Sequence, residues 1–595
     1  MKRIINIILI TTILGGMLFI FSCDDEFLKE EPPGSAAGSV MQDEKGVESL
    51  LVGAYDMITG NWIFGACMGT DWTWGSCASD DAYKGTTEGD QTPFNDVELY
   101  QTLPTNPYMV DRWGDCYNGV SRTNDVLDFL RATQEGDNPI PEVRAKEIEA
   151  EAKFLRAWYH FKATRIFENI PYIKTEEELG MKPDEVPNDD PGWDDIEADL
   201  KFAIDNLPED PPKGEVGRAD KWAALAVKAH VHLYQNELSD AKPLLDNIIN
   251  NGPFELAPEY YHNYNEENEN NMESIFEIQV SMSAEDRAWW GVAANNLGLH
   301  GAVFHQRGEA GVGWGFYQPS QNLFEAFQTT EDGLPVLDVE DRDELKSDMG
   351  VASGDEFIPT DHPLDPRVDY TIARRGIDFL GWGIHRGREW VRSQSNGGPY
   401  MTKKYMHPKA TSGKYSSPAG DFKNPQNFRA YRYGHVLLWR AEIAVEEDDL
   451  DYARQLVNQV RNRAKSSEYI KGLVTDYTLD AQPDPADIDW DADAANYVIE
   501  PYPANAAAFQ SQEEARKAVR LEQRLEFATE GMRFFDLRRW GIADQVLNDF
   551  IEEDGQFRSF MRGASYDPEK DDYWPLPQPQ LDLQEGVLEQ DPAYK

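Results

Sequence analysis

Residues 219–250 read ADKWAALAVKAHVHLYQNELSDAKPLLDNIIN, and apolar residues recur along them at helical spacing. They form two stripes: Ala223, Ala226, Ala229 and Leu233, then Ala241, Leu244, Leu245 and Ile248. Small residues on one helix face allow a partner helix to approach closely, and alternating small and large positions are typical of stacked helix pairs. The stretch therefore predicts a helical hairpin of the kind that repeat proteins stack.

A second hairpin of this kind is predicted at residues 431–464, YRYGHVLLWRAEIAVEEDDLDYARQLVNQVRNRA. Further long helices are expected near 141–168 and 511–534, where apolar residues again follow a helical period. Both hairpins resemble degenerate tetratricopeptide units. The predicted fold is mainly α: a tetratricopeptide-like helical repeat superhelix.

Between the two hairpins lies a long section, about 252–428, that is rich in Gly, Pro, Asn and aromatic residues. A loop this long inside a compact protein is usually functional or carries small elements of its own. We therefore expect residues 41–595 to form a single domain, with a helical scaffold and an irregular, loop-rich ligand-binding insertion at about 252–428.

The N-terminus resembles a bacterial lipoprotein signal. Met1-Lys2-Arg3 is basic, residues 4–21 are almost entirely apolar, and Ser22 precedes Cys23. Residues 1–22 are predicted to be the cleaved signal peptide, and Cys23 the acylated first residue of the mature chain. Residues 23–40 form an acidic, then Pro/Gly/Ser/Ala-rich tether. No later segment is apolar enough to span a membrane, which favours a lipid anchor.

The charge of the chain excludes some partners. With 56 Lys and Arg against 107 Asp and Glu, the formal net charge is -51. Such a surface repels nucleic acid and anionic membranes. Neutral ligands are favoured over acidic ones, although Arg386, Arg388 and Arg392 are close enough in sequence to form a local basic patch.

The sequence contains none of the common catalytic or nucleotide-binding motifs, so we predict no catalytic residues and no enzyme. His230 and His232 point to different faces of their predicted helix and cannot share a metal there. Asp487, Asp489, Asp491 and Asp493 alternate like the start of a calcium loop, but Ala492 and Val498 replace its essential Gly and Glu. The cofactor prediction is none, with a structural calcium ion as the alternative.

Three further cysteines, Cys67, Cys77 and Cys116, are expected to be structural or incidental. Export permits disulfides, and Cys67 and Cys77 are spaced to close a short loop, which would leave one thiol over. Whether this disulfide forms stays open at the level of the sequence.

Several tryptophans lie in Gly-rich loops rather than on helix stripes. An aromatic ring with a polar edge suits a sugar, because C–H faces stack on the ring while neighbouring polar groups bind hydroxyls. The expected ligand-binding residues are Trp74, Trp289, Trp290 and Trp382, with Trp72 and Tyr83 nearby in sequence. Trp314, within a tight Gly-Trp-Gly, is expected to be structural.

The C-terminal residues resemble one family closely. EQRLEF (522–527) and EGMRFFDLRRWG (530–541) resemble the SusD/RagB hallmarks E-R-R-x-E-L, E-G-x-R and D-L-x-R-W, with Gln523 in place of Arg. Residues 150–161, 319–333, 433–442 and 572–595 resemble further segments of the family in the same order, although Gly434-His435 stands where the family usually has Ala-Glu.

This resemblance implies a function. SusD/RagB members are outer-membrane lipoproteins of Bacteroidota that sit as a lid on a SusC-like TonB-dependent transporter and capture a nutrient, most often a glycan. It therefore implies a lipid-anchored glycan-binding protein on the extracellular side of the outer membrane, and Asp24-Asp25-Glu26 resembles the acidic export signal of such lipoproteins. The alternatives are the same lid with peptide cargo, as in RagB-like members, and a pure scaffold or an enzyme.

The hallmark residues themselves predict a structural role. Arg520 and Arg524 lie four residues apart on one helix face and would repel each other unless carboxylates such as those of Glu526 and Glu530 reach them. Gly531 is expected to interrupt the helix. We predict a partly buried network of arginines and carboxylates that joins the C-terminus to the helical repeats.

Overall fold

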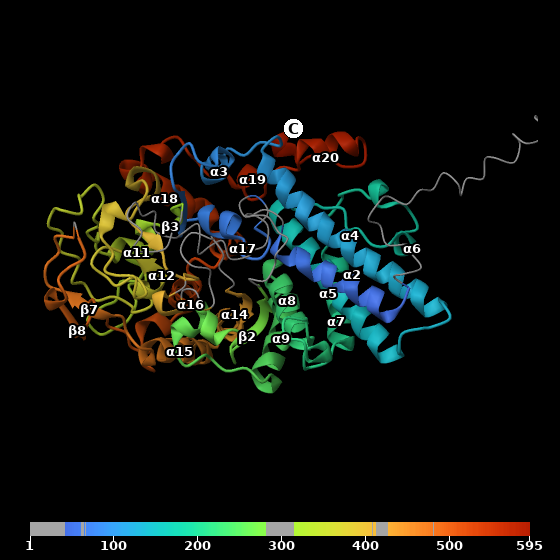
Figure 1. The fold of residues 1–595 in the computed structure, drawn as a ribbon, viewed down its shortest axis with the longest axis horizontal. Helices are drawn as coiled ribbons and strands as arrows, with labels where there is room; N and C mark the ends of the chain where they lie inside the picture. The colour runs from blue at the N-terminus through green and yellow to red at the C-terminus, as the bar shows by residue number, and fades with distance from the viewer. Residues whose placement is uncertain are drawn as a thin grey trace, which may run out of the picture.

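The predicted helical fold is confirmed. The computed structural model describes residues 42–60, 65, 67–280, 314–406, 408–411, 414, 426–479 and 481–595. Within them, helices dominate and the strands are short (Figure 1). No helix in these ranges combines the length and the apolar character that crossing a membrane requires. The predicted signal peptide, Cys23 and most of the tether lie outside the described residues.

The scaffold consists of long helices that pack in chain order. They are α2 (Glu44–Asp56), α4 (Pro107–Glu135), α5 (Glu142–Phe167), α7 (Trp193–Asn206), α8 (Lys221–Tyr234), α9 (Leu238–Asn251), α14 (Tyr433–Glu446), α15 (Leu450–Ser466) and α16 (Gln512–Phe527). Each packs on the next, and α14 follows α9 directly although some 180 residues separate them in sequence. The array is continuous, as a helical repeat superhelix requires.

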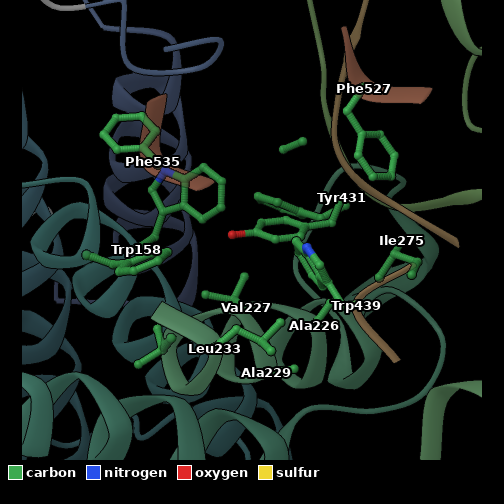
Figure 2. Packing of buried hydrophobic residues seen from close by; sticks show 14 of the residues in the cluster. Trp158, Ala226, Val227, Ala229, Leu233, Ile275, Tyr431, Trp439, Phe527 and Phe535 are labelled. Atoms are coloured by element: carbon green, nitrogen blue, oxygen red, sulfur yellow. The ribbon is translucent and has the colours of Figure 1, made fainter. Parts of the chain in front are cut away.

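Both predicted hairpins are present as α8–α9 and α14–α15. The Asp220 side chain caps α8 by accepting a hydrogen bond of 2.8 Å from the backbone N–H of Ala223. The alanines of the predicted stripe are buried, and Figure 2 shows Ala226 and Ala229 on the helix that lies beneath Tyr431 and Trp439. Small side chains on α8 therefore make room for large aromatic rings from the second hairpin region.

The irregular section contains only short elements where it is described. Its longest helix, α11 (Gln321–Ala326), has six residues. Four antiparallel two-stranded sheets occur in the described part of the chain: β1 (Ala82–Gly85) with β3 (Phe316–Pro319), β2 (Ser274–Ile278) with β6 (Phe428–Arg432), β4 (Ile372–Ala373) with β5 (Met401–Thr402), and β7 (Lys471–Val474) with β8 (Ile488–Asp493). Two strands of the irregular section, β2 and β3, thus pair with β6 at its C-terminal boundary and with β1 before it, whereas β4 and β5 pair with each other.

The remaining helices are short or C-terminal. They are α3 (Thr92–Glu98), α6 (Glu176–Leu179), α12 (Val368–Thr371), α13 (Gln394–Gly397), α17 (Arg533–Arg539), α18 (Ala543–Phe557), α19 (Pro568–Asp571) and α20 (Gln578–Leu583). The predicted helix at 511–534 is interrupted as expected: α16 ends at Phe527, and α17 begins after Gly531. In Figure 1 the C-terminal helices α18, α19 and α20 run along the top of the molecule.

The predicted arginine–carboxylate network is confirmed, and it is buried throughout. Glu526 of α16 pairs with Arg432 at 2.6 Å, with Arg367 at 2.9 Å and with Arg463 of α15. Glu530 pairs with Arg432 at 3.1 Å. These contacts join α16 to the second hairpin and to the irregular section.

The expected partners of Arg520 and Arg524 were wrong. Glu526 and Glu530 point to other cations, and Arg524 instead binds Asp80 at 3.0 Å and Asp81 at 2.9 Å. These two aspartates lie more than 400 residues earlier in the chain. The C-terminal helix is therefore attached to an N-terminal segment as well as to the repeats.

Candidate ligand-binding region

Three of the expected ligand-binding aromatic residues lie in the core. Trp72, Trp74 and Tyr83 are 2%, 0% and 3% exposed. The expectation that these rings face a surface is wrong, because a ring that is enclosed on all sides offers no face to a sugar. Gly-rich surroundings suggested loop exposure, yet residues 72–77 form a buried single-turn π-helix.

The buried rings pack against distant parts of the chain. Trp74 donates a hydrogen bond of 2.8 Å from Nε1 to the carbonyl oxygen of Gly65 and contacts Trp574 edge-on. The Tyr83 hydroxyl donates to Asp554 at 2.6 Å, and the Arg558 guanidinium lies 3.7 Å from the Tyr83 ring centroid. These aromatic residues hold the N-terminal segment against the C-terminal helices.

A buried cluster of charges fixes the backbone just before Trp72. The Asp71 carboxylate contacts Arg112 at 2.9 Å, Lys162 at 2.5 Å and Arg165 at 2.5 Å. Burial opposes ionisation, but the three cations outweigh it and hold the pKa of Asp71 below its usual range. Burial also lowers the pKa of Lys162, to about 8. Asp71 itself has a left-handed backbone (φ 50°), a conformation that is uncommon outside glycine.

A second group, the Trp314 cluster, comprises Trp314, Arg392 and Asp90, which are partly exposed, and Thr86, which is buried. The Arg392 guanidinium lies 5.8 Å from the Trp314 ring centroid. Its Nη1 donates to Thr86 Oγ1 at 2.8 Å and to Asp90 Oδ2 at 3.0 Å. An indole with a carboxylate and a guanidinium group beside it has the composition that a sugar-binding surface needs, namely a stacking face and groups for hydroxyls.

The sheet β1–β3 and a buried lysine position this cluster. Trp314 precedes β3, Thr86 follows β1, and Gly85 pairs with Phe316. The Lys84 ammonium donates to the carbonyl oxygens of Thr87 and Asp90 at 3.1 and 2.8 Å and to Asn95 Oδ1 at 2.5 Å. Burial lowers the pKa of Lys84. The lysine thereby organises the turn that carries Asp90. Nothing in the sequence around Lys84, two residues before Thr86, indicated this role.

Trp382 lies at the edge of a small apolar cluster in the irregular section. Trp390, Phe379 and Met401 fill the interior of this cluster, and Trp382 packs on it while remaining partly exposed. Trp382 is thus the one expected ligand-binding aromatic residue in the described part of the chain that keeps an accessible face. Trp289 and Trp290 lie outside the described residues.

Of the three arginines expected to form a basic patch near Trp382, two pair with separate carboxylates. Arg386 pairs with Glu389, and Arg392 pairs with Asp90. Arg388 is exposed. Two of the three arginines are therefore neutralised locally, and they do not form a common cationic surface.

A groove of about 740 Å³ lies between α4, the segment 171–184 and α20. Tyr117 lines it, together with amide and carboxylate side chains such as those of Asn124, Asp125 and Gln580. The Tyr117 hydroxyl donates to the carbonyl oxygen of Pro171 at 2.9 Å, which fixes the ring. Burial and the neighbouring Asp128 raise the pKa of Asp125. The periodicity of α4 did not reveal this groove, because its far wall comes from the C-terminus.

Three of the four aspartates that alternate like the start of a calcium loop lie in a strand. Asp489, Asp491 and Asp493 lie along strand β8, and Asp493 pairs with Lys471 at 2.6 Å. Among the described residues, one trio of possible metal ligands comes together, Glu197, His232 and Glu237. One ligand atom from each of the three residues lies within 4.8 Å of the others, and the two ring nitrogens of His232 lie 3.6 Å from Glu197 and 2.8 Å from Glu237.

Cys67, Cys77 and Cys116 are free and buried. Burial raises the pKa of Cys67 to about 11 and that of Cys116 to about 12. The thiol of Cys116 lies 3.6 Å from the sulfur of Met68. The three thiols are therefore core groups, in line with the structural role expected of them.

Two family models match the chain. The model described as "SusD family" matches residues 272–594, and the model described as "Starch-binding associating with outer membrane" matches residues 26–233. Two curated proteins of Formosa agariphila are similar over nearly the whole length. SusD-like protein P25 is 25% identical, covering 91% of this chain and 92% of its own length. SusD-like protein P2 is 21% identical, covering 100% and 99%.

Solved structures share the fold. A SusD-like protein from Bacteroides fragilis has a TM-score of 0.68 at 21% identity, covering 94% of this chain and 99% of its own. Surface glycan-binding protein A from Bacteroides thetaiotaomicron, in complex with laminarihexaose, has a TM-score of 0.65 at 21% identity, covering 92% and 99%. A laminarin-binding SusD-like protein has a TM-score of 0.61 at 21% identity, covering 93% and 100%.

Proposed function

Because the chain belongs to the SusD family, we propose that it captures a glycan at the cell surface and delivers it to an importer. In this proposal Cys23 carries the lipid anchor, the outer membrane holds the protein on its extracellular side, and the body forms the lid of a SusC-like TonB-dependent transporter. The protein binds its ligand and does not cleave it.

The observation that carries this proposal is the pair of family models, which together match residues 26–233 and 272–594. The description of the first segment names starch binding and association with the outer membrane. Two structural neighbours are described as a laminarihexaose complex and as a laminarin-binding protein, which favours a glycan over other nutrients.

We propose that the ligand contacts Trp289, Trp290 and Trp382, together with the Trp314 cluster. Trp382 and Trp314 are both partly exposed, although the sequence predicted a structural role for Trp314. Arg392 and Asp90 lie beside Trp314 and supply a donor and an acceptor for hydroxyl groups. Trp72, Trp74 and Tyr83 are assigned instead to the core that supports this region.

The test uses soluble protein that begins at residue 24. Affinity electrophoresis and calorimetry against laminarin, starch, other plant, algal and host glycans, and protein digests identify the ligand class. Alanine variants of Trp289, Trp290, Trp314 and Trp382 should each weaken glycan binding by about two- to tenfold, because each stacked ring contributes roughly 0.5–1.5 kcal/mol. Trp490→Ala is the matched control, since Trp490 is 51% exposed on the separate β7–β8 hairpin.

Full binding by all four variants would overturn the site. Binding of peptides but no glycan would favour the same lid with peptide cargo, and release of a product from any glycan would favour an enzyme. Co-purification of a TonB-dependent barrel with the full-length lipoprotein tests the partner. Cys23→Ala protein that still stains on intact cells would overturn the anchor.

A further inference from the structure

A pocket of about 560 Å³ with both charged and apolar lining residues lies at the C-terminal end of the fold, between α16, α17, α18 and the segment 337–342. In Figure 1, α16 and α18 belong to the orange-to-red part of the chain. Arg342 and Arg520 line the pocket, with Leu337, Val546 and Phe550 as apolar wall residues. Its volume is within the range of small-molecule sites.

Arg520 has no carboxylate partner in the described part of the chain, because nearby acids are bound elsewhere. Glu442 accepts two hydrogen bonds from Arg539, at 2.6 and 2.9 Å. Glu446 accepts two from Arg516, at 2.7 and 2.8 Å. The Arg520 guanidinium lies 4.9 Å from the Trp540 ring centroid, and its Nε is buried without a hydrogen-bond acceptor. An unmatched buried donor of this kind is costly.

Arg342, on the segment 337–342, resembles Arg520 in its lack of a carboxylate partner in the described part of the chain. Its Nε and Nη2 donate to the carbonyl oxygens of Val336 and Leu337, at 3.2 and 3.4 Å, so its hydrogen bonds in the described structure go to neutral acceptors. The neighbouring carboxylate of Asp80 is already bound by Arg524 and Arg533. Of the five arginines that line the pocket, Arg342 therefore also lacks a countercharge of its own in the described part of the chain.

The pKa values of both arginines are lowered, as expected for buried cations without a paired carboxylate. Burial, with Arg524 and Arg533 nearby, lowers the pKa of Arg342 to about 10. Burial, opposed by Glu442 and reinforced by Arg516, lowers the pKa of Arg520 to about 10. Both groups remain cationic near neutral pH. Of the other acids of the pocket, Asp338 pairs with Lys517 at 2.6 Å, and Glu340, Glu513, Asp549 and Glu553 are exposed at the rim, where water screens them.

We propose that this pocket binds the carboxylate or sulfate group of an acidic sugar through Arg342 and Arg520. A guanidinium donates two parallel hydrogen bonds to such an anion, and this geometry favours arginine over lysine. The apolar wall accommodates the C–H face of the ring. The identification of the ligand as a sugar rests on the proposed function, whereas the anion site itself does not.

The test is calorimetry at low ionic strength with glucuronic acid, glucose 6-sulfate, glucose and sodium sulfate. The acidic sugars should bind and glucose should not, with sulfate as a competitor. Arg342→Gln and Arg520→Gln should each weaken acidic-sugar binding by about tenfold or more. Arg454→Gln is the matched control, because Arg454 pairs with an exposed aspartate, Asp451, outside the pocket, and it should bind like the parent.

Laminarin is titrated in parallel, so that a failure of neutral-glycan capture is seen separately from a failure of this pocket. The titrations of the parent protein test whether acidic sugars bind, even if a variant does not fold. Absence of binding by both acidic sugars overturns the proposal, and so does binding of sulfate alone. Equal binding of glucose, or unchanged affinity in folded Arg342→Gln and Arg520→Gln proteins, also overturns it.

Discussion

The backbones of Gly75 and Gly531 are in direct contact. A hydrogen bond beside them joins Gly531 to Ser76, which lies 455 positions earlier in the chain. A Cβ atom on Gly75 would overlap the carbonyl oxygen of Gly531, and one on Gly531 would overlap the carbonyl oxygen of Thr70. Gly531 also has a φ of +78°. The glycine of the C-terminal E-G-x-R hallmark is therefore required where the N-terminal π-helical segment crosses the chain between α16 and α17.

We expect Gly531→Ala to destabilise the protein by about 2–4 kcal/mol, because it adds a steric overlap to an unfavourable backbone conformation. Gly541→Ala separates the two effects: Gly541 has a φ of +66°, but a Cβ atom added to it would meet nothing within 4 Å. This control should cost about 1 kcal/mol. Chemical denaturation measures both, and equal losses would contradict the close-approach explanation.

Glu526→Gln should destabilise the fold by about 3–5 kcal/mol, since Arg367, Arg432 and Arg463 would lose a buried countercharge. Lys201→Gln provides the control, because Lys201 and Asp205 form an exposed pair on α7. Its effect should stay within about 0.5 kcal/mol. Denaturant midpoints measure both values. If the two variants unfolded at the same midpoint, the buried network would not contribute to stability as argued.

The helical scaffold could be predicted because its signal is local. Residues 219–250 contain the whole stripe of each helix and the Asp220 cap, and both helices form as expected. By contrast, the burial of Trp72 and Trp74 depends on partners far along the chain, such as Tyr317 and Trp574. No window of sequence around a Gly-rich turn reveals such partners, so those rings resembled surface residues.

The same reason accounts for the candidate sites. Trp382 could be predicted as an accessible ring, but the grouping of Trp314, Arg392 and Asp90 requires β1 to pair with β3, more than 230 residues away. Likewise, the charge pattern of α16 predicted that its arginines need carboxylates, without revealing that Asp80 and Asp81 supply them for Arg524. Periodicity predicts which face of an element is buried, and only the assembled fold determines its partner.

Glu530 predicts a specific pH dependence. Burial alone would raise its pKa, but Arg432 and Lys404 outweigh burial and lower it to about 2. A carboxyl whose pKa is lowered on folding stabilises the native state above its unfolded pKa, and this contribution disappears as the pH falls towards the folded value. Glu530→Gln should therefore cost about 2–3 kcal/mol near neutral pH.

The difference between the parent and Glu530→Gln should narrow as the pH falls from about 4.5 to about 2. Glu209→Gln is the control, because Glu209 forms an exposed pair with Lys221. Urea denaturation across this pH range measures the difference. A gap between parent and Glu530→Gln that stays constant over the range would contradict the assigned ion pairs.

The three buried thiols predict slow chemistry in the native state. Cys67, Cys77 and Cys116 are enclosed, and burial raises the pKa of each, so little thiolate exists at about pH 8. Soluble protein that begins at residue 24 should show almost no reaction with a thiol reagent until it is unfolded, and should then show three reactive groups without added reductant. Cys116→Ser, which removes one thiol from the core, should show two. A single reactive group in the unfolded parent, rising to three after reduction, would mean that two of the three cysteines are joined by a disulfide, and no reactive group in unfolded, unreduced Cys116→Ser would identify that pair as Cys67 and Cys77.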